Sequence, residues 1–182
     1  FTDEPPYEVI HSNAMSYEEL LILKDIEDVL EKYYNSGAFE RTMEHLLQVH
    51  APDAPFDLFA GVAEFFRKKG YLGKAISRKD LYEILHSYCE EVLKDSSAEE
   101  MLIFDYCMRY RDHLSFMHDG GLKERAFEFL KNSALVEKYF PERAGEKPVQ
   151  LYKHLRFYRF SNVVCAFDCK KQIVCDITAD FT

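Results

Sequence analysis

The spacing of apolar residues changes once along this chain, and that change limits what the chain can fold into. Up to about residue 148 the apolar side chains recur every three or four residues, which is the period of an amphipathic helix. After Pro148 they alternate at every second residue, which is the period of a strand with one buried face. The pattern predicts a mainly helical, bundle-like domain with a small C-terminal antiparallel β-hairpin or meander.

The expected boundaries follow from the same pattern. Pro5 and Pro6 disfavour helix, so residues 1–15 are expected to be an extended linker. Residues 16–148 should form the helical domain. Residues 149–182 should form a meander packed on the helices, because an isolated hairpin is only marginally stable. Helices are expected over about 16–35, 38–49, 55–69, 77–93, 98–117, 122–132 and 133–140, and strands over 151–160, 163–167 and 173–177.

Capping signals mark several of these helices. Ser16-x-x-Glu19 is a capping box, in which each side chain can bind the free backbone N–H of the other residue. Ser77 and Ser97, each with an acid three residues later, predict two further helix starts. Gly37 can take the left-handed conformation that ends a helix. The helical prediction therefore rests on local chemistry as well as on periodicity.

Composition excludes some classes of protein. The chain has 182 residues, of which 47% are hydrophobic, so it can bury a core without disulfides or metals. Its net charge of -9 argues against a nucleic-acid binder. Residues 1–35 hold nine acids and two bases, and residues 122–159 hold nine bases and five acids. This asymmetry fits solvated helix faces of differing sign, contact between the two ends, or an acidic end that meets a basic partner surface.

The termini and cysteines suggest a compartment and a context. Five cysteines, an odd number, and no signal peptide argue against a secreted disulfide scaffold. No apolar run is long enough to cross a bilayer. We therefore expect a cytoplasmic protein without a membrane partner. Because the chain opens at Phe1 with no initiator Met, we also expect it to be part of a longer polypeptide.

Candidate metal and catalytic residues occur in four groups, none of which makes a complete motif. Cys165-x-x-x-Cys169 could begin an iron–sulfur or zinc site, but Cys165 and Cys175 could instead face each other across a hairpin as small buried side chains. The other three groups lack ligands or a nucleophile: the pair on one helix and the polar helix end supply too few metal ligands, and the last two histidines have no nucleophile beside them. These last three groups are His86 with Cys89, then Asp112, His113, His118 and Asp119, and finally His45 with His50. The sequence therefore predicts no catalytic, cofactor or metal site in this chain.

The most unusual stretch is Tyr33-Tyr34-Asn35-Ser36-Gly37. It can be a plain helix C-terminus, or a docking surface, because tyrosine is enriched at protein interfaces. The candidate docking residues are Pro5, Pro6, Tyr7, Tyr33, Tyr34, Asn35, Ser36 and Gly37.

Two blocks carry a resemblance to a known family. The first is Pro5-Pro6-Tyr7-Glu8-Val9 with residues 15–20 and then Leu23-Lys24, and the second is the stretch 33–39. Together they resemble the region just after the barrel in bacterial cobalamin-binding radical SAM proteins, which are often labelled Fe–S oxidoreductases. In those proteins a helical C-terminal domain of unknown function follows the barrel. Residues 129–132 and 155–158 also fit the tail of that domain.

The resemblance implies a parent that uses a 4Fe–4S cluster, S-adenosylmethionine and cobalamin. The family's cluster motif, CxxxCxxC, lies in the barrel. It is absent here, because Lys170, Lys171 and Gln172 follow Cys169. No catalytic residue of the family can therefore be assigned to this chain, and the expected partner is the upstream radical SAM barrel of the same polypeptide.

Three hypotheses follow. The first is an accessory C-terminal domain that packs on the barrel and shapes its opening. The second is a helical protein–protein interaction or dimerisation module, which the charge asymmetry and the tyrosines motivate. The third is an independent metal-binding protein or hydrolase that uses the histidines, acids and cysteines.

Overall fold

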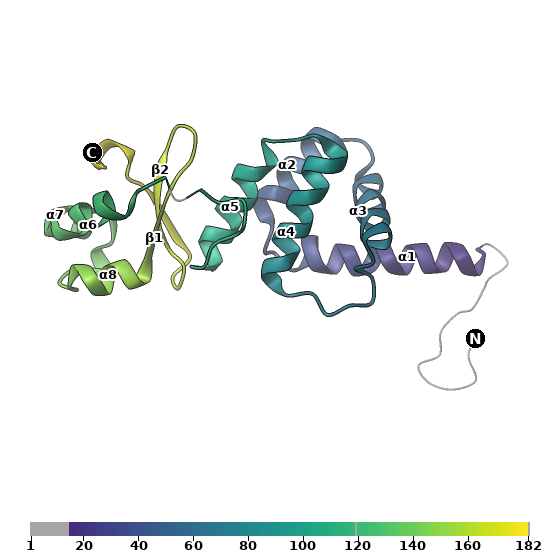
Figure 1. Cartoon of the computed structure of the whole chain (residues 1–182), viewed down its shortest axis with the longest axis horizontal. Coiled ribbons are helices and arrows are strands. Elements are labelled where there is room, and N and C mark those ends of the chain that lie inside the picture. The colour runs from purple at the N-terminus through teal and green to yellow at the C-terminus, as the bar shows by residue number, and fades with distance from the viewer. Residues whose placement is uncertain (1–14, 119, 182) are drawn as a thin grey trace. The chain divides into compact units, whose positions relative to one another are not determined.

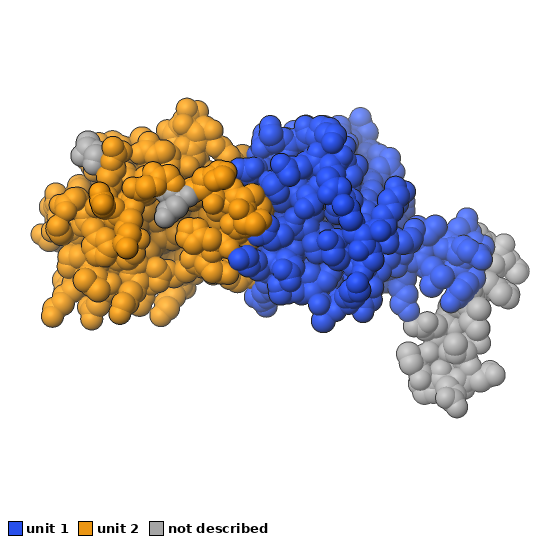
Figure 2. Space-filling model, in the orientation of Figure 1, with its two compact units in different colours: residues 1–99 blue, residues 100–182 orange. Residues whose placement is uncertain are grey.

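The computed structural model describes residues 15–118 and 120–181, which form two compact units (Figure 2). Unit 1 ends at Glu99 and unit 2 begins at Glu100, within helix α5 (Ala98–Arg109). Helices dominate both units, and a three-stranded antiparallel sheet lies in unit 2 (Figure 1). The predicted fold class, mainly helical with a small C-terminal antiparallel sheet, is confirmed.

Unit 1 is built from four helices, two of which continue as π-helical segments. The elements are α1 (Tyr17–Leu30), η1 (Glu31–Asn35), α2 (Glu40–His50), α3 (Pro55–Lys69), α4 (Arg78–Tyr88) and η2 (Cys89–Leu93). The predicted capping box begins α1: Ser16 Oγ accepts from the backbone N–H of Glu19, and the Glu19 carboxylate accepts from the N–H of Ser16. Ser77 caps α4, as predicted: its hydroxyl oxygen accepts from the backbone N–H of Asp80.

Two buried tyrosines tie unit 1 together. Tyr33 and Tyr82 are each 1% exposed, and their hydroxyls donate to the backbone carbonyls of Leu81 at 3.0 Å and Ala38 at 2.6 Å. The Phe39 ring lies between them, with its centroid 4.8 Å from that of Tyr33 and 4.1 Å from that of Tyr82. Each phenol therefore buries a large apolar ring without leaving its hydroxyl unpaired.

Unit 2 packs short helices on one face of the sheet. Its elements after α5 are α6 (Lys123–Lys131), α7 (Ser133–Tyr139), η3 (Pro141–Arg143), α8 (Pro148–His154), β1 (Leu155–Arg159), β2 (Val164–Asp168), β3 (Ile173–Asp176) and η4 (Thr178–Asp180). The strand order is β1-β2-β3, with Phe157 opposite Ala166. Both of these residues belong to the core cluster that α6, α7 and α8 complete. Phe167 points to the other face, where its ring meets Phe104 of α5 at 5.3 Å.

The strand expected from residue 151 begins four residues later. Residues 148–154 are helical, because Pro148 at the first helical position fits a helix start and removes no needed N–H donor. Leu151 and Leu155, four residues apart, are each 1% exposed and enter the same core. The alternation of apolar and polar residues over 151–160 therefore predicted a strand where the first four residues are helical.

Helix α5 ends earlier than the expected residue 117. It stops at Arg109, and the guanidinium of Arg156 donates to the carbonyls of Tyr110 and Asp112 just beyond. This arginine of β1 thus donates to backbone carbonyls that would otherwise accept from N–H groups of a further helical turn. The helix start predicted at Ser97 is confirmed, because α5 begins at Ala98. The Glu100 carboxylate accepts from the backbone N–H and the hydroxyl of Ser161.

The boundary between the compact units lies at residues 99 and 100 rather than at 148 and 149, where the apolar period changes. The reason is that the sheet shares its core with α6, α7 and α8, so these helices belong with the strands. Within residues 15–118 and 120–181, no helix has both the length and the hydropathy that crossing a bilayer requires.

Neighbouring tyrosines allow a matched test of the unit 1 core. Tyr33→Phe should lower the free energy of unfolding by about 1 kcal/mol, because it removes a buried hydrogen bond to a backbone carbonyl. Tyr34→Phe should change it by less than about 0.5 kcal/mol, since Tyr34 is 56% exposed. Urea unfolding of the purified chain measures both values. Equal effects at the two positions would contradict the assignment of Tyr33 to the core.

Candidate functional site

The first two turns of α1 expose an apolar surface. Tyr17, Leu21, Ile22 and Leu23 are between 40% and 51% exposed, although three of them are aliphatic. Figure 1 shows these turns extending past the other helices of unit 1, and Figure 2 shows them standing out from the body of that unit. We call residues 17–24 the exposed segment of α1.

Helix geometry explains why unit 1 does not cover this segment. Successive residues lie about 100° apart around a helix, so four consecutive apolar residues, Leu20 to Leu23, surround nearly the whole axis. One neighbouring helix covers one face only. The neighbour here, α3, pairs its Arg67 with Asp25 of α1 and ends at Gly70 in a left-handed conformation (φ 71°). A helical turn with apolar side chains on every side is typical of a buried environment, and the described residues leave Leu21, Ile22 and Leu23 largely uncovered.

The predicted docking residues divide between core and surface. Tyr33 belongs to the core, so the folded chain cannot offer it for docking. Its neighbour Tyr34, in the same π-helical segment, is 56% exposed. Tyr34, Asn35, Ser36 and Gly37 are all exposed. Asn35 donates to Glu31, and Ser36 accepts from the N–H of Ala38, so both side chains also shape the turn. Pro5, Pro6 and Tyr7 lie outside the described residues.

The three C-terminal cysteines do not converge. Ala166, and not Cys165, is opposite Cys175, so the expected pairing of Cys165 with Cys175 is wrong by one residue and their side chains point to opposite faces. Cys169 Sγ donates to the carbonyl of Cys107 at 3.1 Å, and Cys175 Sγ to that of Tyr139 at 3.3 Å. Burial raises the pKa of the Cys169 and Cys175 thiols, which keeps both protonated at neutral pH.

The other proposed ligand groups also lie apart or serve other partners. His86 approaches two acids, Glu99 at 3.3 Å and Glu90 at 3.7 Å. His113 Nδ1 faces the guanidinium of Arg156 at 3.2 Å. Asp119 lies outside the described residues. In residues 15–118 and 120–181, no three His, Cys, Asp or Glu side chains meet closely enough to hold a metal ion.

Sequence reasoning missed one cluster in unit 1. Nε2 of His45 and Nε2 of His50, both on α2, each lie 2.8 Å from the same oxygen of Asp95. Ser97 donates to the other oxygen of Asp95 and lies 3.1 Å from His45. The expectation that no nucleophile lies beside these histidines was therefore wrong. No local pattern indicates the cluster, because about fifty residues separate its two halves.

This Ser, His and Asp arrangement does not form a hydrolytic triad. In a triad the histidine uses one ring nitrogen for the serine and the other for the aspartate. Here the same nitrogen of His45 faces both Asp95 and Ser97, and the Ser97 hydroxyl is bound to Asp95. The cluster instead ties the end of α2 to the turn after η2. Burial alone would raise the pKa of Asp95, but hydrogen bonds from Ser97, His50 and His45 outweigh it and hold this pKa well below its usual value.

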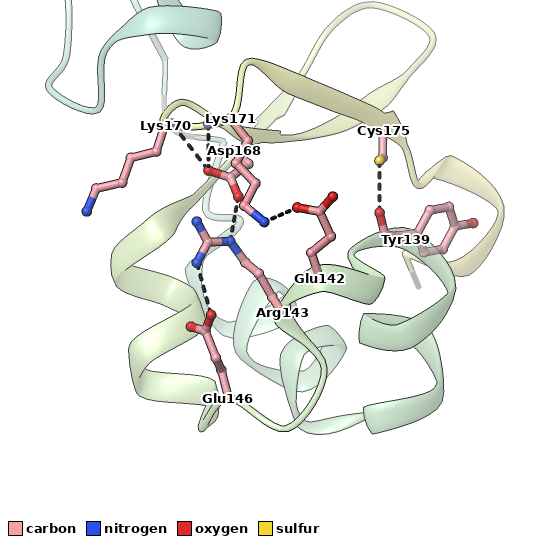
Figure 3. Close-up of polar contacts among 8 residues, drawn as sticks. All are labelled: Tyr139, Glu142, Arg143, Glu146, Asp168, Lys170, Lys171 and Cys175. Atoms are coloured by element: carbon pink, nitrogen blue, oxygen red, sulfur yellow. Dashed lines mark hydrogen bonds and ion pairs between the residues drawn. The ribbon is translucent and has the colours of Figure 1, made fainter.

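Figure 3 shows a second polar cluster, in unit 2, which joins the β2–β3 turn to η3. Arg143 donates to Asp168 at 2.5 Å and to Glu146 at 3.0 Å. The other Asp168 oxygen accepts from the backbone N–H groups of Lys170 and Lys171. Burial alone would raise the pKa of Asp168, yet the hydrogen bond and charge of Arg143 hold that pKa below its usual value. Arg143 and Asp168 satisfy each other, so this cluster is structural.

The lowered pKa of Asp95 predicts acid-sensitive stability. An aspartate with a depressed folded-state pKa contributes stability above its unfolded-state pKa of about 3.9, and that contribution is lost as the pH falls through the folded-state value. Asp95→Asn should therefore lower the free energy of unfolding near neutral pH and flatten its decline below about pH 4. Denaturant unfolding between pH 7 and pH 2 measures this, with exposed Asp53→Asn as the control. An unchanged pH slope in the Asp95 variant would contradict the prediction.

Comparison with known proteins places the chain in a family without assigning it an activity. No curated protein and no solved structure is detectably similar to the chain. The family described as "Protein of unknown function (DUF4080)" matches residues 1–175. Because this match spans nearly all of the sequence, the chain belongs to the DUF4080 family.

Proposed function

We propose that this chain is the C-terminal accessory domain of a cobalamin-binding radical SAM Fe–S oxidoreductase. In this proposal the exposed segment of α1 packs on the upstream barrel of the same polypeptide and helps to shape its opening. The 4Fe–4S cluster, S-adenosylmethionine and cobalamin belong to that parent. The resemblance of residues 5–9, 15–20, 23–24 and 33–39 to the region after such a barrel motivates the proposal.

The observation that carries the proposal is the apolar turn formed by residues 20–23 within the exposed segment. Leu21, Ile22 and Leu23 point in three directions around α1, and each remains at least 40% exposed. Burying an aliphatic side chain of this size stabilises a contact by about 1.5–3 kcal/mol. The segment also overlaps the first of the two resembling blocks, which includes residues 15–20 and 23–24. A domain upstream in the same polypeptide is thus well placed to cover it.

Charge favours a different partner over a second copy of the chain. Glu18 and Glu19 flank the apolar residues of the exposed segment, within an acidic region of nine acids and two bases over residues 1–35. Pairing two such segments would bring like charges together, which opposes association. A partner surface with basic residues at its rim would complement them. The homodimer hypothesis therefore remains the second candidate.

The docking prediction is tested by comparing two proteins of different length. The double substitution Leu21→Glu with Ile22→Glu should leave the thermal unfolding midpoint of the 182-residue chain nearly unchanged, because both side chains are exposed there. In the full polypeptide, where the segment is covered, the same change should lower that midpoint by several degrees. Differential scanning calorimetry measures both proteins. Val92→Glu, at a side chain 52% exposed elsewhere in unit 1, serves as the matched control and should affect neither protein.

Further readouts separate the alternatives. Cleavage of S-adenosylmethionine by the full polypeptide should fall in the double variant and not in the control. Equal midpoints for variant and parent in both lengths of protein would refute docking through the exposed segment. Sedimentation of the 182-residue chain addresses the second candidate: self-association that the double substitution abolishes would favour the homodimer.

A further inference from the structure

Unit 2 contains a small pocket whose walls are basic. Its volume is about 100 Å³, and it lies where the loop after α5, the first turn of α6, and the junction of α8 with β1 meet. Arg111, His113, Lys123 and Arg156 are among its nine lining residues, and no Asp or Glu is. The remainder of the lining is apolar or aromatic. The charge of the pocket is therefore of one sign.

Arg156 is the buried member of this group. It is 7% exposed, and its donors reach the backbone carbonyls of Tyr110 and Asp112, a histidine nitrogen and a methionine sulfur. None of these partners carries a negative charge. Its Nε has no hydrogen-bond partner within the described part of the chain. The Asp112 carboxylate is bound to the Tyr106 hydroxyl and not to Arg156. A guanidinium buried without a directly bound counter-charge is costly, so an anion in the pocket would lower that cost.

Arg143 provides an internal comparison in the same unit. Its side chain is 8% exposed, about as buried as that of Arg156, but it is paired with the carboxylates of Asp168 and Glu146. The chain thus neutralises one buried arginine fully. For Arg156 the described residues offer only neutral acceptors, which sets this position apart.

The other basic groups are positioned at the pocket by their own contacts. Arg111 donates to the carbonyl of Tyr152 at 2.8 Å and to that of Leu155 at 3.4 Å, which holds its guanidinium at the end of α8. His113 Nδ1 accepts from Arg156, so the proton of this imidazole is on Nε2, which is a donor. Lys123 is at the first turn of α6, where the helix dipole adds positive potential.

The size and charge of the pocket indicate the chemical class of its ligand. A volume of about 100 Å³ is well below the roughly 300 Å³ at which pockets for larger ligands begin, so a compact group fits and a whole nucleotide does not. Two arginines and a lysine carry three permanent positive charges, which a dianion balances better than a monoanion. Guanidinium groups also match the geometry of phosphate oxygens.

We propose that this pocket binds a phosphate-sized oxyanion, either inorganic phosphate or the phosphoryl group of a small molecule. Arg156 supplies the buried charge, and Arg111, His113 and Lys123 supply further donors around the oxyanion. The proposal concerns unit 2 alone and does not depend on docking of the exposed segment of α1.

Calorimetric titration of the 182-residue chain tests the proposal. Inorganic phosphate and glycerol 3-phosphate are titrated separately at constant ionic strength, with sodium chloride as the reference titrant. Saturable binding of one ion per chain is the expected result. Tighter binding of glycerol 3-phosphate identifies a phosphorylated molecule as the source, and tighter binding of inorganic phosphate identifies the free ion. Heats no larger than those with chloride for either titrant would overturn the proposal.

Substitutions then locate the binding. Lys123→Gln should weaken phosphate binding about tenfold, because it removes one charge-assisted contact. Lys131→Gln, on the same helix but outside the pocket, should leave the affinity unchanged. Arg156 is not substituted, because it also binds the carbonyls after α5 and its loss could disturb the fold. Equal affinities in the two lysine variants would show that phosphate binds elsewhere and would overturn the assignment.

Discussion

The buried ion pair between Arg143 and Asp168 is the interaction on which unit 2 most depends. Asp168 is at the end of β2 and is 1% exposed, so its charge must be neutralised within the protein. Arg143 does so from η3, while the turn residues Lys170 and Lys171 donate their backbone N–H groups to the same carboxylate. One carboxylate therefore shapes the β2–β3 turn and attaches it to the helical layer. Removing one partner of such a pair typically costs about 3–5 kcal/mol.

The need to neutralise a buried charge also applies to Arg156. It is equally buried, yet its charge is met by carbonyls, an imidazole and a thioether rather than by a carboxylate. Its position serves the fold, because it satisfies the backbone beyond α5. It also leaves a positive charge beside a small pocket. The contacts that stabilise the end of α5 and the proposed anion site thus share one side chain.

In unit 1 the buried polar groups find their partners within the unit, and the surface left uncovered is apolar. Its buried tyrosines donate to backbone carbonyls, and its two histidines and one serine surround Asp95, so these groups need no further partner. What remains is apolar: the exposed segment of α1, which lies beyond the end of α3. The two units therefore differ in what they offer to other molecules, an apolar helix end in unit 1 and a basic pocket in unit 2.

Local chemistry in the sequence determined most of the helices and the meander. The capping residues Ser16, Glu19 and Ser77 act within three positions along the chain, so their effect can be read without knowing the fold. The alternation after residue 155 and the turn before β3 are local in the same sense. The family resemblance, by contrast, located the docking residues only as a stretch of sequence.

Only the tertiary structure decided which residues of the stretch 33–37 are exposed and so available for docking. Tyr33 and Tyr34 are chemically identical neighbours, and packing against Phe39 and Phe66 buried one and left the other exposed. Likewise the end of α5, the His45–Asp95 contact and the register that separates Cys165 from Cys175 depend on partners far away in sequence. The physical reason is that caps and periodicity act over one turn, whereas burial and charge pairing depend on which distant segments meet.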